Sequence, residues 1–219
     1  MIENVVFIRP PKIGGTSIAM ALGLSGYAKD LKSASDISGW AQFGHMHYPT
    51  LVKMGLVSEE FDKSAFKFSF VRNPYDRMVS MFFYYKQWWL ISKGSGRRVK
   101  RWESKFETFL EFCQHVGSGP IPPLGAYTMI HDENHVQSGY NPQVRWFEGL
   151  ELDFLGRFEK MDEDYEKLSK ILGIPYVKLP KVRTSKHKHY EEYYCPESRE
   201  IINRVYGEDF ERFNYPIHH

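Results

Sequence analysis

Apolar runs and helical patterns alternate along the first part of the chain. The apolar run 4–9 predicts a buried strand, and a glycine-bearing loop and a helical pattern at 17–24 follow it. A second apolar run, 66–71, is rich in Phe and Val and predicts another buried strand. Strand, loop and helix in this order form the first half of a β–α–β unit. We therefore expect an α/β fold.

The helix after the second strand has clear boundary signals. Asn73 is a suitable N-cap residue, and Pro74 suits the first helical position. From Tyr75 to about Leu90, apolar residues recur every three to four positions and predict a stripe that faces the core. The stripe consists of Met78, Met81, Phe82, Tyr85 and Trp89.

Helical patterns and a strand pattern also follow one another in the rest of the chain. Further helices are expected near 49–54, at 106–116, from Asp162 to Gly173 and at 196–206, and a further strand at 154–158. The chain has no internal repeat and no low-complexity tract. With 219 residues, it is long enough for one α/β domain, and we expect a single domain over 1–219.

Composition argues against several kinds of partner, site and targeting segment. The formal net charge of +2 provides no bulk field that attracts polyanions, so we expect no nucleic-acid partner. Cys113 and Cys195 lie far apart in the sequence without a CxxC motif, which argues against a disulfide framework and a structural zinc site. The N-terminus lacks the pattern of a signal peptide, and no apolar stretch reaches the roughly 18 residues of a membrane span. We expect a cytoplasmic protein, although a trimmed Golgi luminal domain would look the same.

The loop after the first strand is a candidate anion site. It reads Lys12-Ile13-Gly14-Gly15-Thr16-Ser17. Glycines between a strand and a helix let backbone N–H groups approach an anion, and the hydroxyls of Thr16 and Ser17 add donors. In nucleoside triphosphatases a lysine follows the last glycine directly. Here Thr16 follows Gly15 and the basic residue is Lys12, which disfavours ATP or GTP chemistry.

Two further segments carry candidate chemistry. Arg72 ends the strand at 66–71, where open α/β sheets bind ligands, and Ser80 lies two turns along the next helix. Together they could hold a phosphate, although a strand-terminal Arg is as often part of a structural ion pair. His45 and His47 follow Gly44 closely. A histidine with a near-neutral pKa suits the removal of a hydroxyl proton, and an H-x-H pair can also ligate zinc.

Two of these segments together resemble a known family. The stretches FIRPPKIGGTS (7–17) and VRNPYDRMVS (71–80) resemble the two motifs with which sulfotransferases bind 3′-phosphoadenosine 5′-phosphosulfate (PAPS). The match is most similar to the carbohydrate branch with the heparan sulfate 2-O-sulfotransferase-like enzymes, and the segments 156–159, 190–194 and 206–215 fit it too. The resemblance implies a P-loop NTPase-like three-layer sandwich, in which helices flank a central, mostly parallel sheet.

The resemblance also implies roles for individual residues. Gly14, Gly15, Thr16 and Ser17 would hold the 5′-phosphosulfate, Lys12 would stabilise the leaving group, Arg72 and Ser80 would bind the 3′-phosphate, and Ser185 and Lys186 would close over the nucleotide. His45 would be the catalytic base, and His47 a helper or a packing residue. No metal is required, because lysine and arginine charges replace magnesium. Ile13 departs from the family loop, which more often has Thr at this position.

We therefore expect transfer of a sulfuryl group from PAPS to a hydroxyl, with a saccharide as the expected acceptor. The aromatic segment 84–89 and the basic run 97–101 could line a saccharide cleft, or they could be core aromatics and a solvated loop. Two alternatives stay open: an ATP-dependent small-molecule kinase, and a non-catalytic nucleotide- or glycan-binding module. The sequence determines neither the acceptor nor the oligomeric state.

Overall fold

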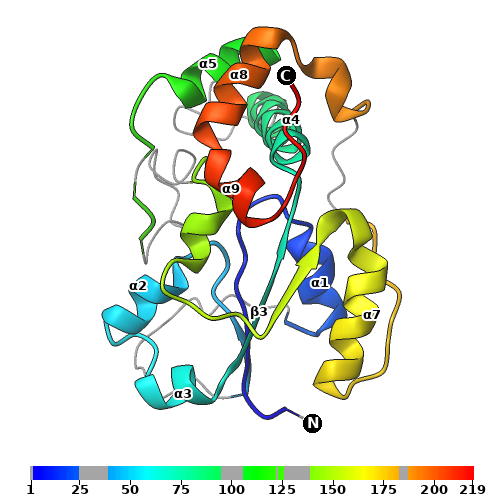
Figure 1. Cartoon of the computed structure of the whole chain (residues 1–219). Helices are drawn as coiled ribbons and strands as arrows, with labels where there is room; N and C mark the ends of the chain where they lie inside the picture. Colours follow the sequence, from blue (N-terminus) through cyan, green and yellow to red (C-terminus); the bar gives the residue numbers. More distant parts are fainter. Residues whose placement is uncertain (1, 25–38, 95–105, 122, 126–138, 183–186) are drawn as a thin grey trace. The chain divides into compact units, whose positions relative to one another are not determined.

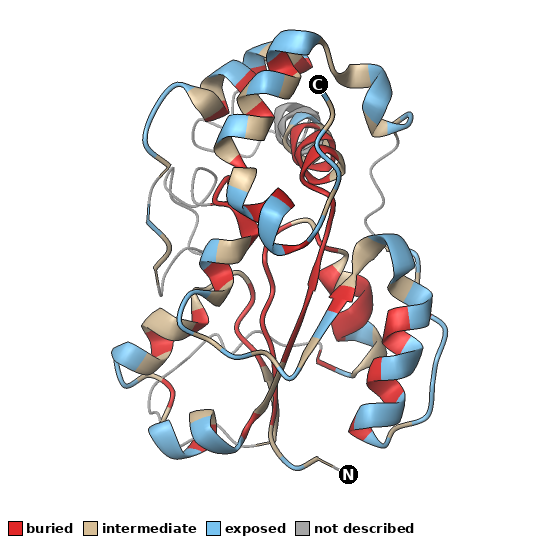
Figure 2. Cartoon of the chain, viewed as in Figure 1, coloured by how far each residue is buried: buried red, intermediate tan, exposed pale blue. Residues whose placement is uncertain are grey.

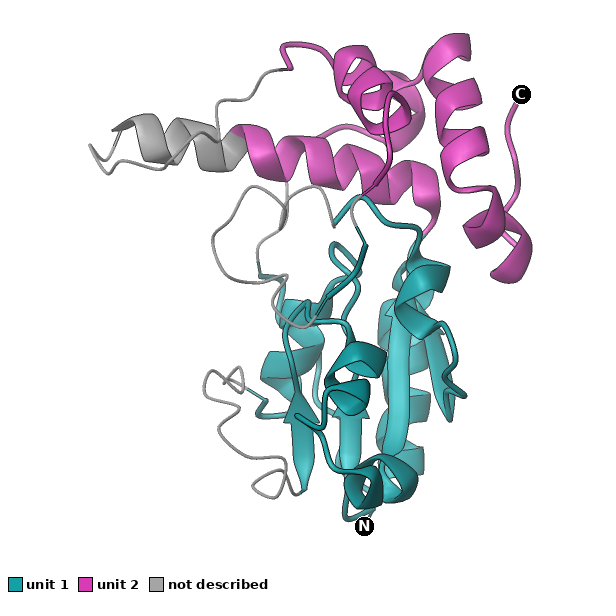
Figure 3. Ribbon diagram, turned by 90° about the vertical axis from the view of Figure 1, so that its left-hand side faces the viewer, with its two compact units in different colours: residues 1–72, 122–183 teal, residues 73–121, 184–219 magenta. Residues whose placement is uncertain are grey.

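The structure is a computed structural model that describes residues 2–24, 39–94, 106–121, 123–125, 139–182 and 187–219 (Figure 1). For residues 87–94 it describes the backbone only. Contacts divide the chain into two compact units, one formed by 1–72 and 122–183 and the other by 73–121 and 184–219 (Figure 3). The single domain expected over 1–219 stays a prediction.

The first unit is built on a four-stranded parallel sheet in the order β2-β1-β3-β4. The strands are β1 (Val5–Phe7), β2 (Trp40–Gln42), β3 (Phe66–Val71) and β4 (Phe154–Arg157). Strand β1 pairs with β2 on one side and with β3 on the other, so that Val5 faces both Trp40 and Phe66. The expected parallel sheet is confirmed.

Helices cover both faces of this sheet. Strand β1 is buried over its whole length (Figure 2). Side chains alternate along β1 and the residue after it, so Val5 and Phe7 pack into one buried cluster while Val6 and Ile8 pack into another. The first cluster includes residues of α1 (Gly15–Ala21) and α7 (Met161–Leu172), and the second includes residues of α2 (Tyr48–Lys53) and α3 (Glu59–Ser64). The three layers confirm the fold that the family resemblance implies.

Several elements differ in detail from the sequence expectation. Helix α7 begins at Met161 with Lys160 as its N-cap, so Asp162 lies in the first turn instead of capping the helix. A negative charge is still favourable in that turn because it faces the positive end of the helix dipole. The helix ends as predicted at Gly173, whose φ is 69°. Strand β2, helix α3 and the short 3₁₀ helices η2 (Gln143–Phe147) and η3 (Phe158–Lys160) were not predicted.

The described part of the second unit is helical. It contains α4 (Pro74–Gly94), α5 (Phe109–Gly117), the 3₁₀ helix η4 (Tyr190–Tyr193), α8 (Pro196–Val205) and the unpredicted α9 (Gly207–Arg212). Asn73 caps α4 as predicted, because its side-chain oxygen accepts a hydrogen bond of 2.9 Å from the N–H of Tyr75. Met78, Met81 and Phe82 of the predicted stripe are buried, whereas Tyr85 is half-buried and the Trp89 side chain lies outside the description. None of the described helices is long and apolar enough to cross a membrane.

Candidate active site

Three of the predicted functional segments follow the carboxyl ends of neighbouring strands. Lys12 follows β1, His45 follows β2 and Arg72 follows β3. The three strands are parallel and adjacent, so these segments leave the sheet at the same edge. Open α/β sheets bind their ligands at this edge, and the first unit therefore brings three separately predicted residues to one side of the sheet.

The loop between β1 and α1 alternates in burial. Lys12, Gly14 and Thr16 are half-buried, while Gly15 and Ser17 are buried. Lys12 and Gly14 have φ angles of 69° and 76°. Glycine adopts this left-handed conformation freely, but a lysine rarely does, and the strain costs on the order of 1–2 kcal/mol. The loop thus holds Lys12 in an unfavourable backbone conformation, a feature that clusters at functional sites.

Neither glycine of the loop has room for a side chain. A Cβ atom at Gly15 would lie 2.8 Å from Nε of Arg9, and one at Gly14 would lie 2.2 Å from Cε of Met161. Gly14, as the N-cap of α1, also provides no side-chain cap for the first turn. The loop is therefore bare backbone packed tightly against its neighbours, which fits an anion held by backbone N–H groups.

Arg72 is fixed beneath this loop by several contacts. Its Nη1 donates a hydrogen bond of 3.1 Å to the carbonyl oxygen of Lys12, and its guanidinium carbon lies 3.8 Å from the ring centroid of Phe158. Its backbone N–H and C=O bind the side-chain amide of Gln143 at 2.9 and 2.8 Å. Arg72 is therefore anchored through both its backbone and its side chain, and the two sequence motifs, far apart along the chain, are joined directly.

Arg9 and Gln42 form a buried pair between the loop and β2. A guanidinium N–H of Arg9 donates to the side-chain oxygen of Gln42, whose amide nitrogen donates to the carbonyl oxygen of Leu24. Arg9 and Gln42 are each 5% exposed. A buried guanidinium needs such partners because desolvating an unpaired charge costs several kcal/mol. The pair ties the loop after β1 to the strand that precedes His45.

The Nδ1 atom of His45 has a defined partner. It lies 2.8 Å from the carbonyl oxygen of Arg9. A carbonyl oxygen only accepts, so Nδ1 carries the proton, and in the neutral ring Nε2 has the lone pair. Gly44, with a φ of 61°, turns the chain just before the histidine. This tautomer is the one that a general base acting through Nε2 requires.

Both ring nitrogens of His47 have partners. Its Nε2 lies 3.1 Å from the carbonyl oxygen of Arg145 and therefore donates, while its Nδ1 lies 2.8 Å from the hydroxyl of Thr50. Burial lowers the pKa of His47, and the bond to the Arg145 carbonyl and the charge of Glu148 oppose this effect. His47 is also the N-cap residue of α2. These contacts tie His47 to Thr50 of α2 and to Arg145 of η2.

The other predicted site residues belong to the second unit or lie outside the described residues. Ser80 is buried in α4 of the second unit. Ser185, Lys186 and the basic run 97–101 lie outside the described residues, as do the side chains at 87–89. Among the side chains that the structure describes, no three of His, Cys, Asp or Glu gather to hold a metal ion.

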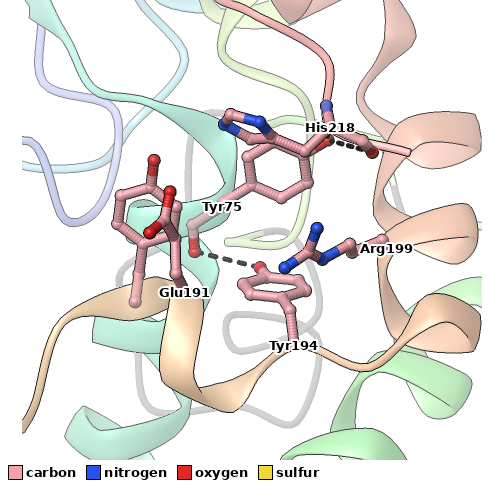
Figure 4. A pocket seen from close by; sticks show the side chains of 6 residues that line it. Tyr75, Glu191, Tyr194, Arg199 and His218 are labelled. Carbon is pink, nitrogen blue, oxygen red and sulfur yellow. Dashed lines mark hydrogen bonds between the residues drawn. The ribbon is translucent and has the colours of Figure 1, made fainter.

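The second unit contains a small pocket of its own (Figure 4). It is lined by Tyr75, Tyr190, Glu191, Tyr194, Arg199 and His218. The rings of Tyr75 and Tyr190 are nearly parallel with centroids 6.2 Å apart, and the Tyr194 hydroxyl donates to the Tyr75 carbonyl oxygen at 3.0 Å. None of the predicted site residues lines it.

Sequence reasoning missed the supporting residues Arg9, Gln42, Gln143 and Phe158. Arg9 and Phe158 lie in segments that carry the family resemblance, so a position-by-position reading of those segments could have singled them out. Gln42 and Gln143 have no such signal. They act through contacts with residues far away in the sequence, and nothing in their own neighbourhood indicates those contacts.

Comparisons with known proteins agree on one family. The protein-family model described as "Sulfotransferase family" matches residues 3–216. Among solved structures, the crystal structure of mouse sulfotransferase SULT7A1 complexed with PAP is similar to this chain with a TM-score of 0.56 and 17% identity. The match covers 96% of this chain and 85% of the mouse chain. A search of curated proteins found no match.

Proposed function

Because this chain belongs to the sulfotransferase family, we propose that it transfers a sulfuryl group from PAPS to a hydroxyl group of a saccharide acceptor. The observation that supports the donor most strongly is the bond between Arg72 and the Lys12 carbonyl, which joins the two motifs for the donor at one edge of the sheet. The similar mouse enzyme is complexed with PAP, the product that PAPS leaves behind.

The donor would be held by the loop after β1. The N–H groups of Gly14, Gly15 and Thr16 and the hydroxyls of Thr16 and Ser17 would bind the 5′-phosphosulfate, while the N–H of Ser17 donates to the carbonyl oxygen of Gly14 at 3.0 Å. Arg72, anchored by Gln143 and Phe158, would bind the 3′-phosphate as a rigid planar donor. Ser80, Ser185 and Lys186 stay predicted donor-binding residues on the strength of the family motifs.

The reaction would be an in-line displacement at sulfur. His45 Nε2 would take the proton of the acceptor hydroxyl as its oxygen forms a bond to sulfur. The bond between sulfur and the bridging oxygen would break, and Lys12 would stabilise the negative charge that develops on adenosine 3′,5′-bisphosphate. Positioning and fixed charges would supply most of the rate enhancement, as in phosphoryl transfer.

We assign the base to His45 and not to His47. The Arg9 carbonyl sets the tautomer of His45 so that Nε2 is the acceptor atom. The lone pair of His47 is on Nδ1, which already accepts from Thr50. Uptake of a substrate proton at His47 would break its bond to Thr50 within α2, whereas the tautomer of His45 places the lone pair on Nε2.

Calorimetry with the purified chain tests the donor site. We expect adenosine 3′,5′-bisphosphate to bind without magnesium, and ATP with magnesium to show no binding. Lys12→Ala and Arg72→Ala should each lower the affinity for the bisphosphate by about tenfold or more, since each removes a charge-assisted contact worth about 1.5–3 kcal/mol. Lys63→Ala is the matched control, because Lys63 forms only an exposed pair with Glu59 on α3.

The same titrations distinguish the alternatives. Binding of ATP with magnesium in place of the bisphosphate would contradict the proposal and favour a kinase. Binding of the bisphosphate without any transfer from labelled PAPS to a panel of saccharides and simple alcohols would contradict the saccharide acceptor. Transfer to a simple alcohol alone would support PAPS as the donor and contradict a saccharide as the acceptor.

A further inference from the structure

The two cysteines of the chain lie in neighbouring helices of the second unit. Cys113 belongs to α5 and is fully buried, and Cys195 is the half-buried N-cap residue of α8. Both are free thiols. They are far apart in the sequence, and their position relative to each other follows only from how α5 and α8 pack.

Side-chain contacts show that α5 and α8 run parallel. Gln114 donates a hydrogen bond of 2.6 Å to the carboxylate of Glu197. About one turn further along both helices, a Cβ atom at Gly117 would lie 2.7 Å from Cγ2 of Ile201, and Arg204 donates to the Gly117 carbonyl at 3.3 Å. An advance along α5 is thus matched by an advance in the same direction along α8.

This register places Cys113 against the first turn of α8. Cys113 lies four residues before Gly117 and therefore on the same face of α5. Gly117 faces Ile201, so the residue one turn before Gly117 faces the turn that begins at Cys195 and contains the buried Ser198. The Cys195 sulfur lies 3.5 Å from the Ser198 hydroxyl oxygen in that turn.

A second contact joins the residues that precede the two cysteines. The ring of Phe109, one turn before Cys113, meets the ring of Tyr194 edge-on with centroids 4.9 Å apart. Tyr194 is itself anchored by its bond to the Tyr75 carbonyl (Figure 4). Residues before and after Cys195, namely Tyr194 and Glu197, therefore contact residues before and after Cys113, namely Phe109 and Gln114.

From this arrangement we propose that Cys195 and Cys113 are a redox-active pair that forms a disulfide when the protein meets a hydroperoxide. The Cys195 thiolate attacks the terminal oxygen of the peroxide, so that an S–O bond forms, the O–O bond breaks and an alkoxide or hydroxide leaves. The Cys113 sulfur then attacks the Cys195 sulfur. The S–S bond forms, the S–O bond breaks, and the hydroxyl leaves with the Cys113 proton as water.

The environments of the two thiols suit this order of events. Hydrogen bonds with Ser198 lower the pKa of Cys195, which raises the thiolate fraction at the more accessible sulfur. Burial raises the pKa of Cys113, which keeps this thiol protonated until an oxidised partner is beside it. Cys195 is thus the peroxide-reactive residue and Cys113 the resolving residue. The pair lies within the second unit and is independent of the proposed sulfuryl transfer.

Oxidation of the full chain with hydrogen peroxide tests the pair. After excess thiol is alkylated, intact mass should show loss of two hydrogens and no alkylated cysteine, and peptide mapping should recover the cross-linked peptides of Cys113 and Cys195. The unfolding midpoint of the oxidised chain should rise by roughly 5 to 10 °C, because the bond closes a long loop, and dithiothreitol should reverse the shift.

Two variants separate the steps. Cys113→Ala should leave a sulfenic acid at Cys195 that dimedone traps, whereas Cys195→Ser should leave Cys113 unoxidised. If Cys113→Ala does not fold, peptide mapping of the oxidised unsubstituted chain still shows whether Cys113 and Cys195 are joined. Recovery of a disulfide between two chains, or of Cys195 as sulfinic acid with Cys113 still reduced, would overturn the proposal.

Discussion

We propose different roles for two histidines separated by one residue, and the proposal rests on the oxygen atoms around their rings. The Arg9 carbonyl holds Nδ1 of His45, while the Arg145 carbonyl and the Thr50 hydroxyl hold the two nitrogens of His47. The environment of a ring nitrogen, and not its distance along the chain, decides whether it can take a proton from a substrate.

Matched alanine variants test this assignment. His45→Ala should lower kcat by about 10²- to 10⁴-fold, the usual contribution of a general base, and leave bisphosphate binding intact. His47→Ala should keep most of the turnover and lose about 1–2 kcal/mol of unfolding free energy, because it removes two hydrogen bonds at the start of α2. Transfer from labelled PAPS and chemical denaturation measure the two effects. A loss of turnover in folded His47→Ala as large as that in His45→Ala would refute the assignment.

At the scale of elements, the pairing of β3 with β4 supports the candidate site. In this register Phe70 lies opposite Gly156 and Val71 opposite Arg157. Strand β4 then leads directly into Phe158, whose ring lies against the guanidinium of Arg72. The aromatic contact of Arg72 therefore depends on close packing between the two strands.

Gly156 is the position where this packing is tightest. A Cβ atom there would lie 2.3 Å from Cε1 of Phe70, which is fully buried. We expect Gly156→Ala to lower the unfolding free energy by about 1–3 kcal/mol through overpacking and to weaken bisphosphate binding as Phe158 shifts. Gly207→Ala is the control, because a Cβ atom at the start of α9 meets nothing within 4 Å. Denaturant titration and calorimetry measure both effects, and equal stability of the two variants would contradict the prediction.

At the scale of the whole molecule, the low net charge means that groups in direct contact with the donor, and not the overall electrostatic field, must recognise it. A formal charge of +2 cannot attract a polyanionic nucleotide by itself, so the affinity must come from individual side chains and backbone groups, among which we propose Lys12 and Arg72. Binding to the folded state alone also stabilises the whole chain by mass action.

We therefore expect adenosine 3′,5′-bisphosphate at a hundred times its dissociation constant to raise the unfolding free energy by about 2.7 kcal/mol. For a chain of this length, the unfolding midpoint should rise by roughly 5 to 10 °C. Adenosine 5′-monophosphate at the same concentration should give a much smaller shift, because it lacks the 3′-phosphate that we assign to Arg72. Thermal scans check this, and equal shifts for the two nucleotides would argue against recognition of the 3′-phosphate.

Elements with strong local signals were predicted well. Strand β3 has the predicted bounds because its apolar run is uninterrupted, and α4 begins where Asn73 and Pro74 indicate. Strand β2 was missed because it has only three residues and its strand conformation depends on pairing with β1. Helix α3 was missed although Ser58 caps it, since a single turn and a half of helix has too few residues to show a period.

The sequence by itself determined the family and the α/β class, and it singled out the motif residues Lys12 to Ser17, His45 and Arg72 as candidates. These depend on short contiguous patterns, whose chemistry is visible in the order of residues. Only the tertiary structure decided that Arg72 reaches the Lys12 carbonyl, that the Arg9 carbonyl holds Nδ1 of His45, and that α5 packs against α8. Such contacts join residues distant along the chain, and they arise only when strand order and helix packing bring those residues together.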